Sequence, residues 1–394
     1  MQSHLNKKGH KWTNGILIII TLMIVLYVAY VKGFISLGIT KLVELEVTKE
    51  LLTLDIKEKS TIGINEKQIY KVTSDGITSY NFEGEEIWSD TFSMGNFISV
   101  QRKPYIAVGS MQGNHIILFN EKGRQAEIIT DHPIVYFSVN ESGGIATIEN
   151  ENNSYTVSAY DTSGKKLCWR TTFISEDGYP IVAELSPDNK LLLISYVSVD
   201  EPQVVSRIIA IDVEDRETEN VDNIKYGYKQ TNNLIYDIEF ISKNTWVSIG
   251  DKAIDWYDLE GNQKGTQNNL SAVFVPYLTK MTEHGLGYFP MIITEKPTQN
   301  VVHRQDELVY FNDIGAETFS INLDGGIEYF YADENGVTIQ KANVFRGYDK
   351  LGNPFFEYTA TTDVSKVIYI PSLKKGIAVN KENVLLLTPK KEKK

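Results

Sequence analysis

The sequence predicts an all-β fold: an eight-bladed β-propeller, with seven blades as the alternative, preceded by one N-terminal transmembrane helix. An uncharged apolar run near the N-terminus predicts the helix. A five-residue turn motif that returns at a spacing of about 40 residues predicts the propeller. The expected segments are a cytoplasmic tail at 1–14, the helix at 15–36, a tether at 37–42, the propeller at 43–390 and a basic tail at 391–394.

The helix is predicted by Gly15–Val31, GILIIITLMIVLYVAYV, which contains no charged residue. With the apolar residues that follow Lys32, the run reaches about 20 residues, enough at ~1.5 Å per residue to cross a ~30 Å hydrocarbon layer. Lys7, Lys8 and Lys11 precede it, so the positive-inside rule keeps the N-terminus in the cytoplasm and sends the body across the membrane. The alternative, a cleaved signal peptide, needs a shorter apolar core and a small-x-small cleavage site, a pattern that Val31–Phe34 at the end of the run lacks.

Charge is unevenly distributed along the chain. Residues 1–41 contain five Lys and no Asp or Glu (+5), and the whole chain carries −12, so residues 42–394 carry −17. An acidic body argues against nucleic-acid binding, which depends on clustered Lys and Arg. Cys168 is the single cysteine, which excludes an intrachain disulfide, and we expect it to be a small buried side chain.

The turn motif is an aromatic residue, Asn or Asp, two further residues, and Gly. The Asx side chain can bond the backbone two residues on, and the Gly supplies the positive φ at which the chain reverses. The copies are Tyr80–Gly84, Phe119–Gly123, Tyr160–Gly164, Tyr257–Gly261, Phe311–Gly315 and Tyr348–Gly352, with a degenerate copy at Ile211–Asp215.

Strand-like segments surround each turn, so that strand, strand, strand, Gly turn and strand make one four-stranded blade. The expected blades are 60–93, 94–132, 133–177, 178–231, 232–271, 272–326 and 327–363. Residues 364–390 supply only three more strands. The segments Val43–Val47 and Leu51–Leu54 can complete that blade, which would close the ring by pairing the two ends of the domain and would leave no open sheet edge.

The turn followed by a Trp, as in Tyr80 to Trp88 and Tyr160 to Trp169, resembles a decayed quinoprotein-type repeat. The anchor and propeller together are similar to an uncharacterised family of membrane-anchored, quinoprotein-like (PQQ-like) propellers typical of Gram-positive bacteria. Quinoprotein-like folds include dehydrogenases and non-enzymatic propellers that scaffold envelope protein assembly. The resemblance implies adjacent cysteines and a calcium site for the dehydrogenases, and a chain with one Cys lacks the first of these features.

No catalytic, cofactor-binding or metal-ligating residue is assigned from the sequence, and no cofactor is expected. The six histidines lack the short spacing of a zinc motif, and Asp-x-Asp-x-Asp-Gly and G-x-S-x-G runs are absent. Two long loops, Tyr196–Ser206 and Thr294–Glu307, are candidates for binding or are passive insertions.

We therefore expect a single-pass membrane protein with an extracytoplasmic propeller that acts as a non-enzymatic protein–protein interaction scaffold in the cell envelope. Its expected partners are the lipid bilayer, through the N-terminal helix, and an unidentified envelope or membrane protein. The alternative is a ligand-binding receptor or an enzyme whose site is assembled across blades in the central funnel.

Overall fold

The computed structural model describes residues 42–198, 203–214, 223–268, 270–274, 288–295, 306–323 and 326–391. The chain divides into two units, Met1–Lys41 and Leu42–Lys394. The predicted transmembrane helix at 15–36 lies outside the described residues. Within the described part of the chain, no helix is long and apolar enough to cross a membrane.

The described secondary structure consists of strands whose bounds follow the predicted pattern of short segments separated by turns. The strands are β1 Val43–Thr53, β2 Thr61–Asn65, β3 Gln68–Val72, β4 Gly76–Tyr80, β5 Glu86–Thr91, β6 Phe97–Arg102, β7 Tyr105–Ser110, β8 His115–Asn120, β9 Gly123–Ile129, β10 Ile134–Val139, β11 Ile145–Glu151, β12 Ser154–Tyr160, β13 Lys166–Phe173, β14 Tyr179–Leu185, β15 Leu191–Ser198, β16 Val205–Asp212, β17 Ile224–Thr231, β18 Ile235–Ser242, β19 Thr245–Gly250, β20 Ala253–Asp258, β21 Gln263–Asn268, β22 Leu270–Phe274, β23 Phe289–Glu295, β24 Asp306–Phe311, β25 Glu317–Asn322, β26 Tyr329–Asp333, β27 Gly336–Lys341, β28 Val344–Tyr348, β29 Pro354–Thr359, β30 Val364–Ile370, β31 Lys375–Asn380 and β32 Asn383–Pro389.

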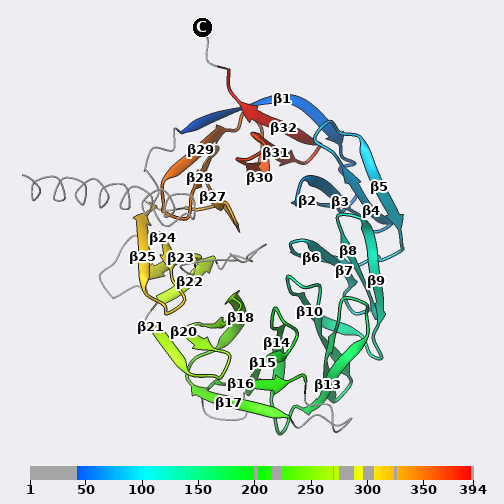
Figure 1. The fold of residues 1–394 in the computed structure, drawn as a ribbon, viewed down its shortest axis with the longest axis vertical. Coiled ribbons are helices and arrows are strands. Elements are labelled where there is room, and N and C mark those ends of the chain that lie inside the picture. The colour runs from blue at the N-terminus through cyan, green and yellow to red at the C-terminus, as the bar shows by residue number, and fades with distance from the viewer. Residues whose placement is uncertain are drawn as a thin grey trace, which may run out of the picture. The chain divides into compact units, whose positions relative to one another are not determined.

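These strands form an all-β propeller of seven to eight four-stranded blades, arranged as a ring with the first strand of each blade innermost (Figure 1). Six sheets hold four consecutive strands each, from β2–β5 to β22–β25. The seventh sheet has eight strands in the order β26-β27-β28-β29-β1-β32-β31-β30. Counted by hydrogen bonding it is one blade, and counted by groups of four strands it is two.

Strand β1 closes the ring, as the sequence predicts. It pairs antiparallel with β32 from Leu45–Pro389 to Thr53–Asn383. Its first residues also pair parallel with β29, through Val43–Phe356 and Glu44–Glu357. This second pairing was not predicted, and it joins the outer edges of two neighbouring groups of strands. The N-terminal strand therefore protects two edges that would otherwise be open.

The Gly turns have the predicted geometry. The Gly at the end of each of the six motif copies has a φ between 72° and 109°, a region that favours glycine. In the first copy, Asn81 Oδ1 accepts the N–H groups of Glu83 and Glu85, both at 2.9 Å. The first of these two bonds is the predicted one; the second fixes the far side of the turn as well.

Each Gly turn also packs against the blade before it. Trp88 of β5 stacks on Phe119 at a centroid distance of 6.0 Å, and its indole N–H donates to the carbonyl of Glu121 at 2.9 Å. At Gly315, a Cβ atom would lie 2.6 Å from the Trp256 ring of the preceding blade. Any side chain there would force the two blades apart, so glycine is required by contact as well as by φ.

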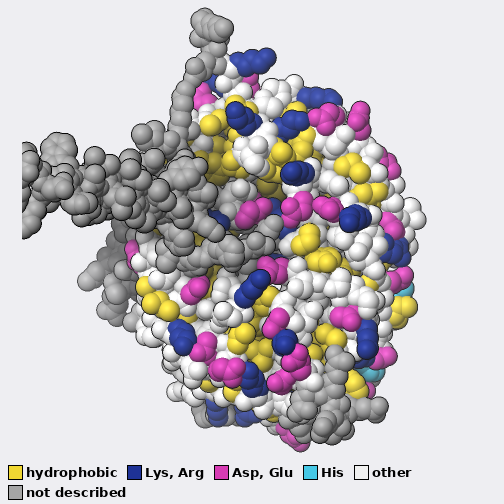
Figure 2. Space-filling view, viewed as in Figure 1, with side chains coloured by type: hydrophobic (Ala, Val, Ile, Leu, Met, Phe, Trp, Pro, Cys, Tyr) yellow, Lys and Arg dark blue, Asp and Glu magenta, His cyan; other side chains and the backbone are white. Residues whose placement is uncertain are grey.

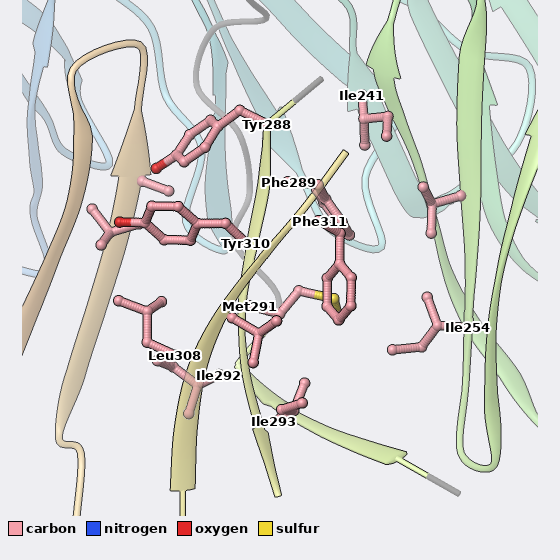
Figure 3. Close-up of a cluster of buried hydrophobic side chains, with 14 of the residues drawn as sticks. Ile241, Ile254, Tyr288, Phe289, Met291, Ile292, Ile293, Leu308, Tyr310 and Phe311 are labelled. Carbon is pink, nitrogen blue, oxygen red and sulfur yellow. The ribbon is translucent and has the colours of Figure 1, made fainter. Parts of the chain in front are cut away.

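The core lies between neighbouring blades, where apolar residues of adjacent sheets meet. The largest cluster joins the β18–β21, β22–β25 and β26–β29 groups and includes Met291, Leu308 and Phe311 (Figure 3). Tyr288 and Tyr310 meet there edge to face, with ring centroids 5.0 Å apart, and their hydroxyls point to the same side in Figure 3. Burial of this apolar area is the main force that holds one blade against the next.

Two boundaries differ from the predictions. The loop predicted at Tyr196–Ser206 is shorter, because Tyr196 of β15 pairs with Arg207 of β16, and Ser206 of β16 pairs with Val197 of β15. The loop predicted at Thr294–Glu307 likewise begins and ends inside β23 and β24, where Thr294 pairs with Asp306. The centres of both loops lie outside the described residues. In both cases the strand pairing continues into the segment predicted as loop.

Candidate functional site

The middle of the ring has a polar hollow at one mouth. It is formed by the turns between the first and second strands of five consecutive blades, and we call it the turn funnel. Its volume is about 660 Å³, and its charged lining residues are Glu66, Lys103, Glu141, Asp188 and Lys243, one from each turn. The funnel therefore combines three carboxylates with two ammonium groups, with no single sign of charge dominating its walls.

Below the turn funnel, one ion pair spans the ring. Arg102, the last residue of β6, places Nη2 2.7 Å from Oε2 of Glu239 on β18. Both side chains are 3% exposed. Arg102 Nη2 also approaches the carbonyl of Phe240 at 3.4 Å. The blades of β10 and β14 stand between these two strands in the ring, so the pair fills the middle of the channel.

The next residue reaches in another direction. Lys103 Nζ lies 3.9 Å from Oδ2 of Asp333, the last residue of β26, and 3.2 Å from Oε2 of Glu334 in the turn that follows. Lys103 is 2% exposed. Burial raises the pKa of Asp333 to about 6, against the lowering effect of Lys103. Arg102 and Lys103 thus tie the β6–β9 blade to two blades across the channel.

Neighbouring strands hold this pair of cations in place. Gln101 Nε2 donates to the carbonyl of Ile64 at 2.9 Å, and Asn65 Nδ2 donates to the carbonyl of Pro104 at 2.8 Å. Both bonds join β6 and its turn to the β2–β5 blade. The turn that carries Lys103 is therefore held by the β2–β5 blade as well as by the ion pairs.

The guanidinium of Arg102 acts on three carboxyl groups, those of Glu184, Asp237 and Glu239, and opposes the rise that burial causes in the pKa of each. Glu184 on β14 accepts the hydroxyl of Tyr136 at 2.8 Å, and burial together with the charge of Glu239 raises the pKa of Glu184 well above its usual range. Burial, and then the charge of Glu239, raises the pKa of Asp237 to about 8. Burial also raises the pKa of Glu239, and Arg102 opposes that shift. The raised pKa favours the protonated form of Glu184, whereas Glu239 has Arg102 to stabilise its charged form.

These axial groups offer limited chemistry. Shifted carboxyl pKa values in a cleft are a property of active sites, and structural ion-pair networks produce them too. Among the described residues, no three His, Cys, Asp or Glu side chains are close enough together to hold a metal ion. Glu239 is already paired with Arg102, and the pair joins the β6–β9 blade to the β18–β21 blade.

The opposite end of the ring carries apolar residues on four of its innermost strands. Ile98, Val135, Ile181 and Tyr236 occupy matching places near the start of the innermost strands of four consecutive blades. In β10, β14 and β18 this residue is the extra residue of a β-bulge, a device that redirects a side chain. Ile98 is 42% exposed and Tyr236 is 38% exposed. We call these four residues the apolar mouth.

The face in Figure 2 shows acidic and basic side chains interspersed around the middle of the ring, with scattered hydrophobic ones. No extended surface of one charge is visible among the coloured residues of this view. On this face, the coloured Lys and Arg side chains do not gather into the continuous basic surface on which phosphate binding depends.

The predictions made for individual side chains can be checked only in part. Cys168 is 3% exposed, as expected for a core residue. His115 and His132 lie near Glu127 and Glu151, each at 3.5 Å, in partly exposed positions. The remaining histidines lie outside the described residues.

The sequence reasoning missed the axial residues. Asp237 and Glu239 stand inside an otherwise apolar strand, Ile235–Ser242, and Arg102 ends another inner strand. A charge at an inward position of an innermost strand was the available signal. Since 137 positions separate Arg102 from Glu239, no local motif could pair them.

The family model described as "Family of unknown function (DUF5711)" matches residues 40–386. The chain belongs to this family. Membership agrees with the resemblance to an uncharacterised propeller family, while the membrane anchor stays a prediction. No curated protein matches the sequence.

Solved structures with a similar chain path are propellers of low sequence identity. BamB from Moraxella catarrhalis is 12% identical, with a TM-score of 0.48 over 87% of this chain and 99% of BamB. Kluyveromyces lactis Hsv2 is 12% identical, with a TM-score of 0.44 over 77% of this chain and 98% of Hsv2. The WD40 domain of Neurospora crassa Pan2 is 11% identical, with a TM-score of 0.44 over 75% of this chain and 89% of that domain. At these values the comparison carries no argument about function.

Proposed function

We propose that this protein is a membrane-anchored, extracytoplasmic propeller of eight blades that acts as a non-enzymatic protein–protein interaction scaffold in the cell envelope. The count of eight treats β30–β32 with β1 as a blade of its own. The uncharged run at 15–31 supports the anchor, and the lysines before it support a cytoplasmic N-terminus.

The observation that carries the scaffold proposal is the contrast between the two mouths of the channel. In the middle of the ring, the charged side chains Arg102 and Lys103 are buried and paired, with Glu239 and Glu334, so these cations already have protein partners. The apolar mouth, in contrast, exposes aliphatic and aromatic side chains together. Exposed apolar groups rimmed by polar ones are typical of protein-binding surfaces.

A receptor or an enzyme with a site in the turn funnel is the second candidate. The convergence of Glu66, Glu141 and Asp188 with Lys243 around a hollow of about 660 Å³ favours it. A ligand in the turn funnel would contact both carboxylate and ammonium groups, so a zwitterion would fit its charges. The two functions place the partner at opposite mouths, so they can be told apart by position.

The test is photo-crosslinking in living cells. A benzophenone amino acid replaces Tyr236 in the apolar mouth, and in a matched protein it replaces Phe173, an aromatic residue of the outer strand β13 that is 51% exposed. A discrete protein adduct from position 236 and none from position 173 is expected. The adduct should be lost when Ile98→Asp is added and kept when Ile129→Asp is added, since Ile129 is 62% exposed on an outer strand. The same adducts from both positions would contradict the proposal.

A further inference from the structure

A second cavity lies at the seam where the ring closes, away from the axial ion pairs. It has a volume of about 580 Å³ and lies between the connection from β1 to β2 on one side and β30 and β31 on the other. Aliphatic side chains form part of its wall, namely Leu54, Ile56, Ile62 and Val379. Hydroxyl, amide and charged groups form the rest, including Lys366 on the innermost strand β30.

Lys366 is a partly buried cation for which the described residues supply no carboxylate partner. Its Nζ donates to the carbonyl of Ile62 at 2.7 Å, which is its one hydrogen bond to the described part of the chain. An ammonium group has three donors, so two remain. Burial lowers the pKa of Lys366, and none of the described carboxylates acts against that shift.

Two carboxylates, Asp55 and Glu58, line the cavity as well, and each has another partner. Glu58 lies 2.7 Å from Lys71, and Asp55 accepts the N–H of Lys57 at 2.9 Å. A desolvated cation is costly unless an anion and further hydrogen bonds compensate it. An anion inside the cavity would supply what the protein does not.

We propose that this seam cavity binds a small organic carboxylate, with its carboxylate on the Lys366 ammonium and its aliphatic part against Leu54, Ile56, Ile62 and Val379. Lys381 is exposed and lies 3.5 Å from Asp363, so the Lys366 ammonium is the lining cation left to match one negative charge. The aliphatic wall favours an alkyl carboxylate over a hydrated inorganic anion. Because the wall comes from both ends of the propeller, the ligand would also stabilise the closed ring. This site does not depend on the scaffold function proposed above.

The probe is hexanoate, titrated into the full-length chain in lipid nanodiscs and followed by ligand-observed saturation-transfer NMR, with 1-hexanol as the uncharged counterpart. Saturable binding of hexanoate is expected, at least about tenfold tighter than that of hexanol, because a charge-assisted hydrogen bond is lost with the alcohol. Lys366→Gln should weaken hexanoate binding by about tenfold or more and leave hexanol binding unchanged. Partitioning of the probes into lipid is the same in every protein compared.

The matched control is Lys381→Gln, which removes an exposed ammonium from the same cavity, one that already lies 3.5 Å from Asp363. It should change hexanoate binding by less than about twofold. A second variant, Ile56→Trp, changes a residue that is 67% exposed and should block the cavity and abolish binding without touching Lys366, so the proposal stays testable if Lys366→Gln does not fold. Absence of saturable hexanoate binding, equal affinity for hexanol, or equal binding to Lys366→Gln or to Ile56→Trp would overturn it.

Discussion

Replacing Arg102 with Met tests whether the ion pair across the channel holds the middle of the ring together. Arg102 lies 2.7 Å from Glu239, and both side chains are 3% exposed. Arg102 is the cation that holds down the pKa of Glu239 against the effect of burial. In the variant, Glu239 must either stay charged in a desolvated place or take up a proton.

The free energy needed to protonate Glu239 sets the expected destabilisation by Arg102→Met. A carboxyl group whose unfolded pKa is about 4.3 takes up a proton at about pH 7.5 at a cost of about 4 kcal/mol, at 1.36 kcal/mol per unit. This value lies within the range of about 3–5 kcal/mol found when one partner of a buried pair is removed. At about pH 5 the same proton costs about 1 kcal/mol, so most of the destabilisation should disappear.

The sign follows from proton linkage. When the pKa of Glu239 is higher in the folded state than in the unfolded state, the folded state holds more protons between those two values. Stability then falls as the pH rises through that window. Arg102→Met should therefore be strongly destabilising near neutral pH and mildly so in weak acid.

Three further variants complete the experiment. Glu239→Gln strands a guanidinium, which cannot lose its proton, so its destabilisation should persist at both pH values. Arg102→Met with Glu239→Met should recover to near the wild-type stability, since a buried pair and well-packed apolar residues are often equivalent. Arg346→Met breaks a pair in which Arg346 is 44% exposed and should cost less than about 1 kcal/mol.

The assay is equilibrium urea denaturation of the full-length chain in nanodiscs, followed by tryptophan fluorescence, to which the fully buried Trp246 and Trp256 contribute. The reasoning is refuted if Arg102→Met is no less stable than Arg346→Met at about pH 7.5. It is also refuted if the destabilisation is as large at about pH 5, because protonation of Glu239 would then not relieve it.

Four other predictions concern Glu184, Gly315, the closure of the ring and the N-terminal anchor. Glu184→Gln mimics the protonated carboxyl. The raised pKa of Glu184 makes stability fall as the pH rises above the unfolded value of about 4.3. In thermal melting, the variant should therefore lose part of this pH dependence and be more stable than the wild type at about pH 8. Gly315→Ala, which forces a positive φ and a contact at 2.6 Å, should destabilise by more than about 1 kcal/mol, whereas Gly95→Ala, with no atom within 4 Å, should be nearly neutral; equal melting temperatures would contradict this. Truncation after residue 363 removes β32, the antiparallel partner of β1, and should abolish the cooperative melt; an intact melt would show that closure is unnecessary. The chain should stay in the membrane pellet after alkaline carbonate washing, and deletion of residues 1–36 should release it; release of both proteins would contradict the anchor.

The sequence was sufficient to predict those parts of the fold that short-range physics determines. Positive φ at Gly84 and Gly352 follows from a five-residue motif in which an Asx side chain bonds backbone N–H groups nearby. The closing role of β1 follows from a count of strands, since 364–390 lacks a fourth. The parallel pairing of Val43 with Phe356 was not predictable in this way, because it depends on how two outer edges meet in space.

The candidate site was beyond prediction for the same physical reason. Arg102 and Glu239 are ordinary charged residues in the sequence, and only the ring brings them to 2.7 Å. Their shifted carboxyl neighbours, Glu184 and Asp237, likewise gain their character from burial between blades. Lys366 is one of many lysines until the closed ring places it in a cavity.

The most direct measurement of the scaffold proposal is an in-cell photo-crosslinking comparison of the two mouths of the channel. A benzophenone amino acid is placed at Ile98 and Tyr236 in the apolar mouth, and at Glu141 and Lys243 in the turn funnel. The account predicts discrete protein adducts from the first two positions and none from the last two. Adducts from the turn funnel alone, or no protein adduct together with a small molecule that copurifies in the funnel, would contradict it.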